Sequence, residues 1–288
     1  MAGDRSKTAQ QQVSRASSPP IEFITLSLRC PVCNTAFNSE IPNPGAPVAR
    51  DSDLRPKFAG PDPLPSLVHC CPSCRYSAYP CGFDSRVEEV DELLDSLSRR
   101  PGDRPPTRMQ SFEENDLDDL RRWIRRGSLT SDLAEGREPY GAERYVLAAR
   151  CHEYVKDDDP LELADYYLRA AWCARATGQP ELERESQREA IARLEAALED
   201  STLATESEKP RIFYLIGELS RRCGDFGKAV DLFSQLDGQN ESVDADEDES
   251  VLFAALARRM LALAAVKSDV NAALPEEDLE VEGDGEAD

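Results

Sequence analysis

The sequence predicts a mainly α-helical protein that begins with a small β module built around a metal ion. Two short cysteine pairs near the start of the chain have the form of zinc-ribbon turns. Helical periodicity of apolar residues follows the second pair and is almost continuous from residue 141 onward. One helix pair in that part has the spacing of a tetratricopeptide repeat. We therefore expect a zinc-ribbon-like module followed by a tetratricopeptide-like helical repeat domain.

These signals divide the 288 residues into five parts. Residues 1–20 are polar and rich in Gln and Ser, so we expect them to be disordered. The zinc-ribbon-like module covers residues 21–84, and a helical linker region covers residues 85–140. The helical repeat domain follows over residues 141–267, and a disordered acidic tail over residues 268–288.

The predicted module starts with an apolar alternation over residues 21–28 that is typical of a strand and leads into the first cysteine pair. Seven prolines between residues 41 and 65 argue against a regular helix or a central strand there. Residues 66–70 are expected to return as a short strand into the second pair. Strand, turn, long loop, strand and turn in this order form a ribbon.

The four candidate metal ligands are Cys30, Cys33, Cys71 and Cys74. Each C-x-x-C turn presents two thiolates from one tight loop, and four thiolates form the tetrahedral site that Zn²⁺ prefers. The 37 residues between the pairs exceed the usual spacing, but doubling a loop costs only about 0.6 kcal/mol. Structural zinc contributes about 10–16 kcal/mol in small peptides. Because four protein ligands leave no position for water, we expect a structural zinc ion and not a catalytic one.

Three neighbouring side chains could replace one of these ligands. Cys70 adjoins Cys71, but successive strand residues point to opposite faces, and the C-P-x-C form of both turns favours Cys71. Cys81 could serve only if the second turn were remodelled, and His69 is redundant beside four thiolates. A redox role for the pairs would need a thiolate of low pKa, usually at a helix N-terminus, and neither pair opens a recognisable helix.

Amphipathic helices are predicted over residues 85–99 and 111–126, with a proline-rich linker over residues 100–108. From residue 141 the apolar positions recur at helical spacing, and Gly178-Gln179-Pro180 separates two of the helices. The expected buried faces are Tyr145, Ala148, His152 and Val155; Leu163, Tyr166, Ala170 and Cys173; and Ile191, Leu194 and Leu198.

Residues 211–236 match the tetratricopeptide pattern most closely, since a small residue, Gly217, lies where paired helices must approach. The preceding pair matches more loosely, because its second helix is longer than the repeat permits. After an acidic linker over residues 240–250, a last amphipathic helix is expected to cap the stack with Phe253, Leu256, Met260 and Leu263.

The net charge of −22 argues against binding to nucleic acid or to an anionic membrane surface. From Asp237 to the end, 16 acidic and 3 basic residues give a net charge of −13, whereas residues 21–81 contain five of each. We interpret the acidic run as a solubilising tail, with a partner-docking segment as the alternative. The chain has neither the apolar region of a secretory signal nor an apolar stretch of membrane-spanning length, so we expect a cytoplasmic protein with reduced thiols.

No sequence motif for a nucleophile elbow, a phosphate loop, a dinucleotide fold or a zinc protease is present. The two histidines are His69 and His152, and the second falls on an apolar helix face, as a hydrogen-bonded core histidine does. Cys151, Cys173 and Cys223 fall within predicted helices and are interpreted as small buried apolar residues. In the polar cluster Arg50-Asp51-Ser52-Asp53, we expect the aspartates to cap turns and to pair with Arg50 or Arg55 in a loop that packs against the ribbon, with ligand binding as the alternative.

Three motifs together resemble a bacterial family known as domain of unknown function 2225: Cys30-Pro31-Val32-Cys33, Arg50-Asp51-Ser52-Asp53 and Cys71-Pro72-Ser73-Cys74-Arg75-Tyr76-Ser77-Ala78. In that family such motifs precede a helical, tetratricopeptide-like region. The resemblance implies metal binding by the four cysteines and a shared but undefined role for Arg50, Asp51 and Asp53. Arg75 stands where the family often has glycine, which bears on the geometry of the second turn.

Three functions compete at this point. The leading hypothesis is a non-enzymatic interaction or scaffold protein whose helical groove binds a peptide or protein partner. An enzyme would use Asp51, Asp53 and His69 between the ribbon and the helices. A nucleic-acid-binding ribbon would need a basic stripe that this module lacks.

Overall fold

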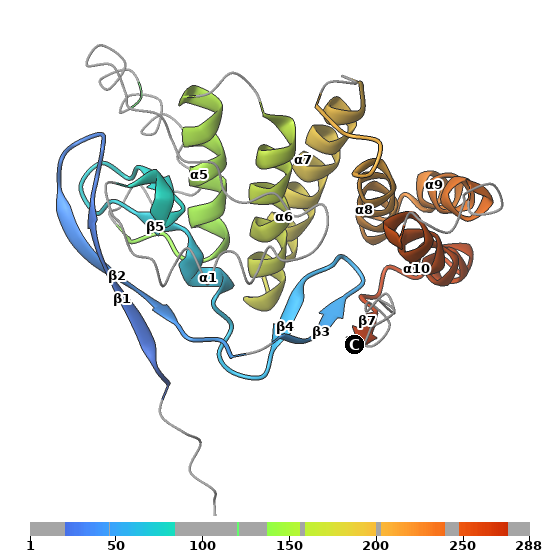
Figure 1. Ribbon diagram of the computed structural model, residues 1–288, viewed down its shortest axis with the longest axis horizontal. Coiled ribbons are helices and arrows are strands. Elements are labelled where there is room, and N and C mark those ends of the chain that lie inside the picture. The colour runs from blue at the N-terminus through green and yellow to red at the C-terminus, as the bar shows by residue number, and fades with distance from the viewer. Residues whose placement is uncertain are drawn as a thin grey trace, which may run out of the picture.

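The computed structural model describes residues 21–45, 47–83, 120, 137–155, 159–199, 203–239 and 248–275. It is mainly helical, with a small strand-rich module at the N-terminal end, as the sequence predicts (Figure 1). Four predicted segments lie almost entirely outside the described residues: residues 1–20, 85–99, 100–108 and 111–126. Leu120, the one described residue among these, is helical and buried.

Two antiparallel hairpins form the ribbon. Strand β1 (Phe23–Arg29) pairs with β2 (Ala36–Pro42), and β5 (His69–Cys70) pairs with β6 (Ser77–Ala78). Each hairpin carries one cysteine pair in its turn, which confirms the predicted order of strands and turns. The free end of the β1–β2 hairpin projects away from the body of the molecule (Figure 1), and Phe23 at this end is exposed.

The proline-rich excursion contains regular structure, contrary to expectation. Strand β3 (Pro47–Asp51) is the centre of a three-stranded antiparallel sheet between β4 (Pro56–Phe58) and β7 (Ala273–Pro275). A proline opens each of β3 and β4, the position where its missing N–H disturbs a ladder least. The short strand predicted over residues 66–70 is mostly wrong, because α1 (Leu64–Leu67) occupies its first half and leaves only β5.

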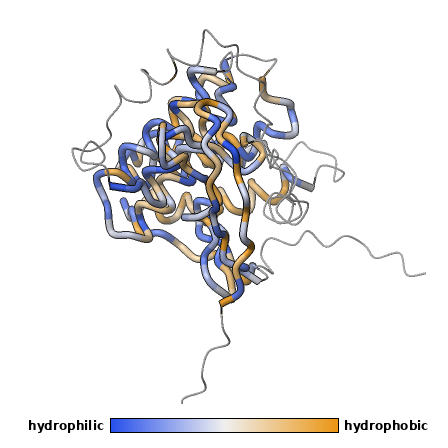
Figure 2. Tube along the Cα trace, turned by 90° about the vertical axis from the view of Figure 1, so that its left-hand side faces the viewer, coloured by the Kyte–Doolittle hydropathy of each residue, from blue (hydrophilic) through white to orange (hydrophobic). Residues whose placement is uncertain are grey.

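The helical part contains α5 (Ala142–Val155), α6 (Pro160–Ala176), α7 (Pro180–Glu199), α8 (Lys209–Arg222), α9 (Phe226–Gln239) and α10 (Asp248–Ala265). Each packs against the next in the chain, and α8 also packs against α10. The turns before α7 and α9 contain Gly178 and Gly224 with φ of 68° and 88°, a backbone region that glycine adopts without strain. Figure 2 shows hydrophobic and hydrophilic stretches alternating along the chain. No helix among the described residues is long and apolar enough to cross a membrane.

Gly217 permits close contact between α8 and α9. A Cβ atom at this position would lie 2.8 Å from Cε1 of Phe233, closer than side-chain carbons approach. The sequence singled out this glycine for the same reason.

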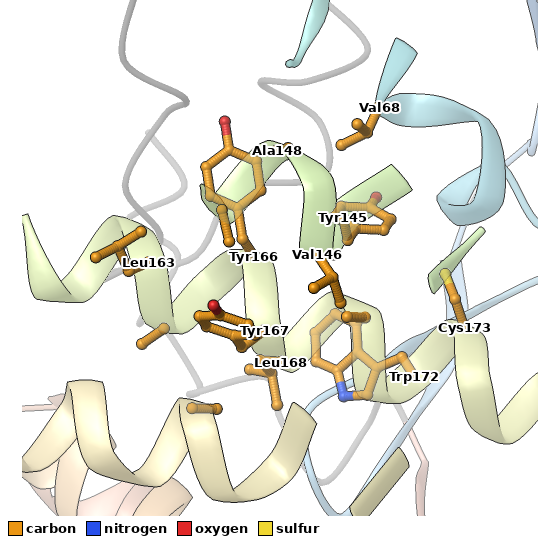
Figure 3. Close-up of a cluster of buried hydrophobic side chains, with 14 of the residues drawn as sticks. Val68, Tyr145, Val146, Ala148, Leu163, Tyr166, Tyr167, Leu168, Trp172 and Cys173 are labelled. Carbon is orange, nitrogen blue, oxygen red and sulfur yellow. The ribbon is translucent and has the colours of Figure 1, made fainter. Parts of the chain in front are cut away.

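The ribbon and the helices share one apolar core. The ring of Tyr79, just after β6, stacks on Tyr166 of α6 with 5.1 Å between centroids, and the hydroxyl of Tyr145 on α5 donates to the carbonyl of Leu64. Figure 3 shows Val68 of the ribbon side facing Tyr145 and Val146 of α5. The ribbon is therefore packed against α5 and α6 and does not form a core separate from theirs.

Residues 268–275, which the sequence placed in the acidic tail, belong to the folded body; we call them the C-terminal strap. Arg221 of α8 donates to the carbonyl oxygens of Ser268 and Val270, the latter at 2.9 Å. Strand β7 then pairs with β3, from which it is separated by more than 200 residues. The rest of the predicted tail, residues 276–288, lies outside the described residues.

Candidate metal centre

The two cysteine turns meet face to face at the ends of their hairpins. The Sγ atoms of Cys30, Cys33, Cys71 and Cys74 all lie within 4.8 Å of one another, and we call this group the four-sulfur cluster. Cys30 Sγ is 3.6 Å from Cys74 Sγ, and Cys33 Sγ is 3.5 Å from Cys71 Sγ. Both distances are far longer than the ~2.05 Å of a disulfide. Four ligands at ~2.3 Å from one ion would be about 3.8 Å apart in a tetrahedron, so these residues could hold a metal ion.

Both turns have the same backbone geometry. The amide of Asn34 donates to the carbonyl of Cys30 at 2.9 Å, and the amide of Arg75 donates to that of Cys71 at 3.0 Å. Asn34 and Arg75 have φ of 60° and 68°, the left-handed conformation that a glycine would adopt without strain. The departure from glycine at Arg75 therefore leaves the turn intact.

Backbone N–H groups inside each turn stabilise charge on the first cysteine. Amides of Val32 and Cys33 bond to Cys30, and those of Ser73 and Cys74 bond to Cys71. Hydrogen bonds to a thiolate favour its charged form, which is the form that binds metal.

The four thiols do not ionise independently. The hydrogen bond from Cys74 lowers the pKa of Cys30 to about 6, whereas burial raises the pKa of Cys71 to about 11. The same hydrogen bond, together with burial, raises the pKa of Cys74. Ions that bind four thiolates must therefore displace protons from this cluster, so binding weakens as the pH falls.

The three alternative ligands, Cys70, Cys81 and His69, do not belong to the four-sulfur cluster. Cys70 is buried, and burial raises the pKa of its thiol. Cys81 is partly buried in the short helix that follows β6. His69 places Nδ1 2.7 Å from the hydroxyl of Ser39, and burial, with Arg144 nearby, lowers the pKa of His69 to about 3. This histidine is therefore a neutral, hydrogen-bonded core residue.

The R-D-S-D loop, Arg50 to Asp53, lies at a different place, between the sheet and the helices. Arg175 at the end of α6 donates to both carboxylate oxygens of Asp53, at 2.6 and 3.1 Å, and to Asp51 at 3.0 Å. Lys57 on β4 lies 2.6 Å from the other oxygen of Asp51. Burial opposes the charge on Asp53, but Arg175 and Arg222 hold the pKa of this carboxyl below its usual value.

Ser52, between the two aspartates, ties the loop to α8 and to the C-terminal strap. Its hydroxyl donates to Glu218 at 2.5 Å, its carbonyl accepts from the hydroxyl of Tyr214 at 2.8 Å, and its amide donates to the carbonyl of Ala272 at 2.7 Å. Glu218 in turn pairs with Arg221, and both side chains are fully buried. The loop therefore makes structural contacts, but the predicted partners were wrong: Asp51 and Asp53 pair with Arg175 and Lys57, whereas Arg55 pairs with Asp62.

The three residues of the enzyme hypothesis, Asp51, Asp53 and His69, do not form one site in the structure. Asp51 and Asp53 bind Arg175, whereas His69 contacts Ser39 and the ring of Phe83. The remaining histidine, His152, is buried on α5 with Nδ1 3.5 Å from Glu162, in the core position expected of it. Cys151 and Cys173 are buried and Cys223 is partly buried, each within or beside a helix.

Sequence reasoning missed the helical partners of the R-D-S-D loop. Four side chains make these contacts and are buried or nearly so, although three of them are of charged types: Arg175, Tyr214, Glu218 and Arg221. Tyr214, Glu218 and Arg221 recur at spacings of four and three, which places them on one helix face. Three polar side chains at helical spacing on one face were the available signal.

One of three comparisons with known proteins found a match. Neither the curated proteins nor the solved structures gave one. A family model described as an uncharacterized protein conserved in bacteria, DUF2225, matches residues 23–252. That range covers well over half of the chain and includes both cysteine turns, the R-D-S-D loop and α5 to α9. The chain therefore belongs to the DUF2225 family.

Proposed function

We propose that this protein is a zinc-stabilised scaffold whose helical part binds an extended segment of a protein or peptide partner. The proposal has two parts, a structural metal in the ribbon and a partner on the helices. They rest on different observations and are tested separately.

The zinc assignment rests on the four-sulfur cluster. Four thiolates suit Zn²⁺ or iron, and four protein ligands around one ion would leave no position for a reacting water. In this role Cys30, Cys33, Cys71 and Cys74 hold the ion, and the ion fixes the two hairpins to each other.

Metal analysis of the purified chain tests this part. We expect one zinc per chain, retained in Cys70→Ser and lost in Cys71→Ser. Cys70 is the matched control, because it is also buried but lies outside the four-sulfur cluster. One iron with visible absorption, or equal metal content in the two variants, would contradict the assignment.

The partner-binding role rests on how α8 already holds a piece of extended chain. Arg221 binds two main-chain carbonyls of the C-terminal strap, and Tyr214 binds the main-chain carbonyl of Ser52. Side chains that bind main-chain groups recognise an extended segment largely independently of its sequence. Helix α8 also approaches α9 closely at Gly217, as paired helices do in tetratricopeptide stacks. Such stacks commonly bind peptides on their inner surface.

Affinity capture from the source cells, followed by lysine cross-linking and mass spectrometry, tests this part. We expect a partner whose cross-links fall on Lys209 of α8, Lys228 of α9 or Lys267 just after α10. A cross-link to Lys57 on β4 would indicate instead that the partner binds on the side of the sheet. Capture of no partner, or cross-links confined to Lys57, would count against a helical binding surface.

A further inference from the structure

The C-terminal strap is held in place mainly through its main chain. Arg221 donates to the carbonyls of Ser268 and Val270. The amide and the carbonyl of Ala272 bond to Ser52 at 3.1 and 2.7 Å. Strand β7 then adds to the edge of β3 in antiparallel register (Figure 1). Proteins commonly bind extended peptides by adding them to a sheet edge in this way. We call Ser52, Arg221 and the paired edge of β3 the strap site.

Few side chains of the strap contribute to its binding. Among residues 268–274, Leu274 alone is fully buried, and it belongs to the apolar core. The Oδ1 atom of Asn271 lies 3.0 Å from the hydroxyl oxygen of Ser52, whereas the side chain of Val270 is 68 % exposed. The strap site therefore fits an extended segment that carries a small polar residue and, three positions later, a large apolar one.

The strap site is built to be filled. Arg221 and Glu218 are fully buried, and the donors of Arg221 that do not bind Glu218 bind the two strap carbonyls. Without a bound segment these donors lose both carbonyl acceptors, which costs free energy. Exchange of the strap for another extended segment would keep these hydrogen bonds, because they involve main-chain groups.

The family match separates the strap site from the strap. The matched range, residues 23–252, includes Ser52, Glu218 and Arg221 and ends before the strap begins. The contact that the strap makes is also short, since it has three residue pairs with β3 and one buried side chain. A segment of similar chemistry from another protein could therefore compete with it.

We propose that the strap site is where the partner binds, and that the C-terminal strap occupies this site as an internal competitor. The inference rests on the proposed function, because it assigns a site and a sequence class to the partner segment. That segment pairs with β3, offers carbonyl oxygens to Arg221 and places an apolar side chain where Leu274 lies. Because the strap belongs to the same chain, its effective concentration is on the order of millimolar, which lowers the apparent affinity for the partner.

Peptide binding to the full-length, metal-loaded protein tests this inference. The probe is a fluorescently labelled synthetic peptide of residues 268–275, and anisotropy measures its binding. Leu274→Asp in the protein should release the strap, because it places a charge where the buried anchor was. Val270→Asp changes an exposed residue of the same strap and is the matched control. We expect the probe to bind Leu274→Asp at least about tenfold more tightly than the parent protein or Val270→Asp.

Peptide variants test the sequence class of the partner. A peptide with alanine at every position except those of Asn271 and Leu274 should bind within about fivefold of the probe, because main-chain groups make most of the contacts. Leu274→Asp in the peptide should weaken binding at least about tenfold, because the apolar anchor is lost.

Hydrogen exchange in the parent protein gives a readout that does not depend on the folding of a variant. With saturating probe, the amides of the strap should lose protection. The amide of Ser52, which donates to Ala272 of the strap, should keep its protection, because the peptide supplies the same acceptor.

The inference is overturned if the probe binds neither the parent protein nor the folded Leu274→Asp variant, or if the affinities of the parent protein, Leu274→Asp and Val270→Asp are equal. Unchanged strap protection at saturating probe also overturns it. A dimer of the parent protein that Leu274→Asp abolishes would assign the site to the strap of a second copy, and so contradict a foreign partner.

Failure of this inference can be distinguished from failure of the proposed function. A captured partner that excess probe does not release would overturn the inference and leave the proposed function standing. Capture of no partner would contradict the proposed function, and the inference with it, even where the probe binds.

Discussion

At the residue scale, Asp53 shows how much of this structure rests on buried charge. Its side chain has no exposed surface, and both of its oxygens accept from Arg175. A pair of this kind contributes little compared with an apolar replacement of both partners. Removal of one partner costs more, because the other charge loses hydrogen bonds in a largely buried place, although Arg175 would keep its bond to Asp51.

Asp53→Asn should therefore lower the free energy of unfolding at pH 7 by about 1.5–3 kcal/mol, the value of hydrogen bonds to a charged group, as measured by urea denaturation, because Arg175 keeps Asp51 as a partner. The matched control is Asp237→Asn, which breaks a surface pair with the largely exposed Arg258 and should cost less than about 1 kcal/mol. Equal losses in the two variants would show that the buried pair is not a strong contributor.

The same variant has a predictable pH dependence. The pKa of Asp53 is lower in the folded chain than the unfolded value of about 3.9, so its ionised form favours folding. This contribution is complete above the unfolded pKa and is lost as the pH falls through the folded pKa. The stability difference between the parent protein and Asp53→Asn should narrow below about pH 4. A difference that stays constant down to pH 2 would be inconsistent with the assignment.

At the element scale, the contact between α8 and α9 depends on a missing side chain. A methyl group at Gly217 would lie 2.8 to 3.2 Å from three ring atoms of Phe233. Gly217→Ala should therefore destabilise the protein by about 1–3 kcal/mol through overpacking, although alanine is the better helix former. Gly238→Ala in α9 is the control, since nothing lies within 4 Å of its Cβ position. Thermal melting should show a loss for the first variant and none for the second. The reverse order would rule out the close contact.

The C-terminal strap is the element whose removal is most informative. A chain that ends at Lys267 loses β7 and both carbonyl partners of the fully buried Arg221. We expect a loss of at least about 2 kcal/mol in urea denaturation. A chain that ends at Pro275 keeps these contacts and should match the parent protein.

A synthetic peptide of residues 268–275 extends this test. Added to the chain that ends at Lys267, it should bind saturably and restore most of the lost stability, because its contacts with Arg221 and β3 do not require a covalent link. A peptide with the same composition in scrambled order controls for unspecific stabilisation. Failure of both peptides would mean that the strap contributes through its attachment and not through its contacts.

Local sequence patterns predicted most elements, because the signals for them lie within a few residues. The alternation of residues 21–28 predicted β1, and the C-P-x-C turns predicted the four-sulfur cluster. Strand β3 could not be predicted in this way, because its partner β7 is far away in the sequence and both strands are short. The ion-pair partner of Asp53 could not be predicted either, because it also lies far away in the sequence. Arg175 looks like a solvent-exposed helix residue until the loop that covers it is placed.

At the scale of the whole molecule, the four-sulfur cluster and the helices share one apolar core. Tyr79 stacks on Tyr166, and Tyr145 bonds to the ribbon side, so loss of the ribbon exposes the surfaces of α5 and α6. A chelator that removes the metal should lower the melting temperature of the entire chain by at least about 10 °C in a single calorimetric transition. Two separate transitions, with the helical one unchanged by the chelator, would show that the ribbon folds on its own.

The pairing of β7 with β3 also sets an order of events during synthesis. When the first cysteine turn leaves the ribosome, the residues that complete its neighbouring sheet have not yet been translated. Asp53 cannot form its ion pair until Arg175 has been translated, and β3 cannot complete its sheet until β7 has been translated. Contacts between such distant segments slow folding and leave strand edges open meanwhile. The nascent protein is therefore most vulnerable to aggregation and proteolysis in the interval before β7 emerges.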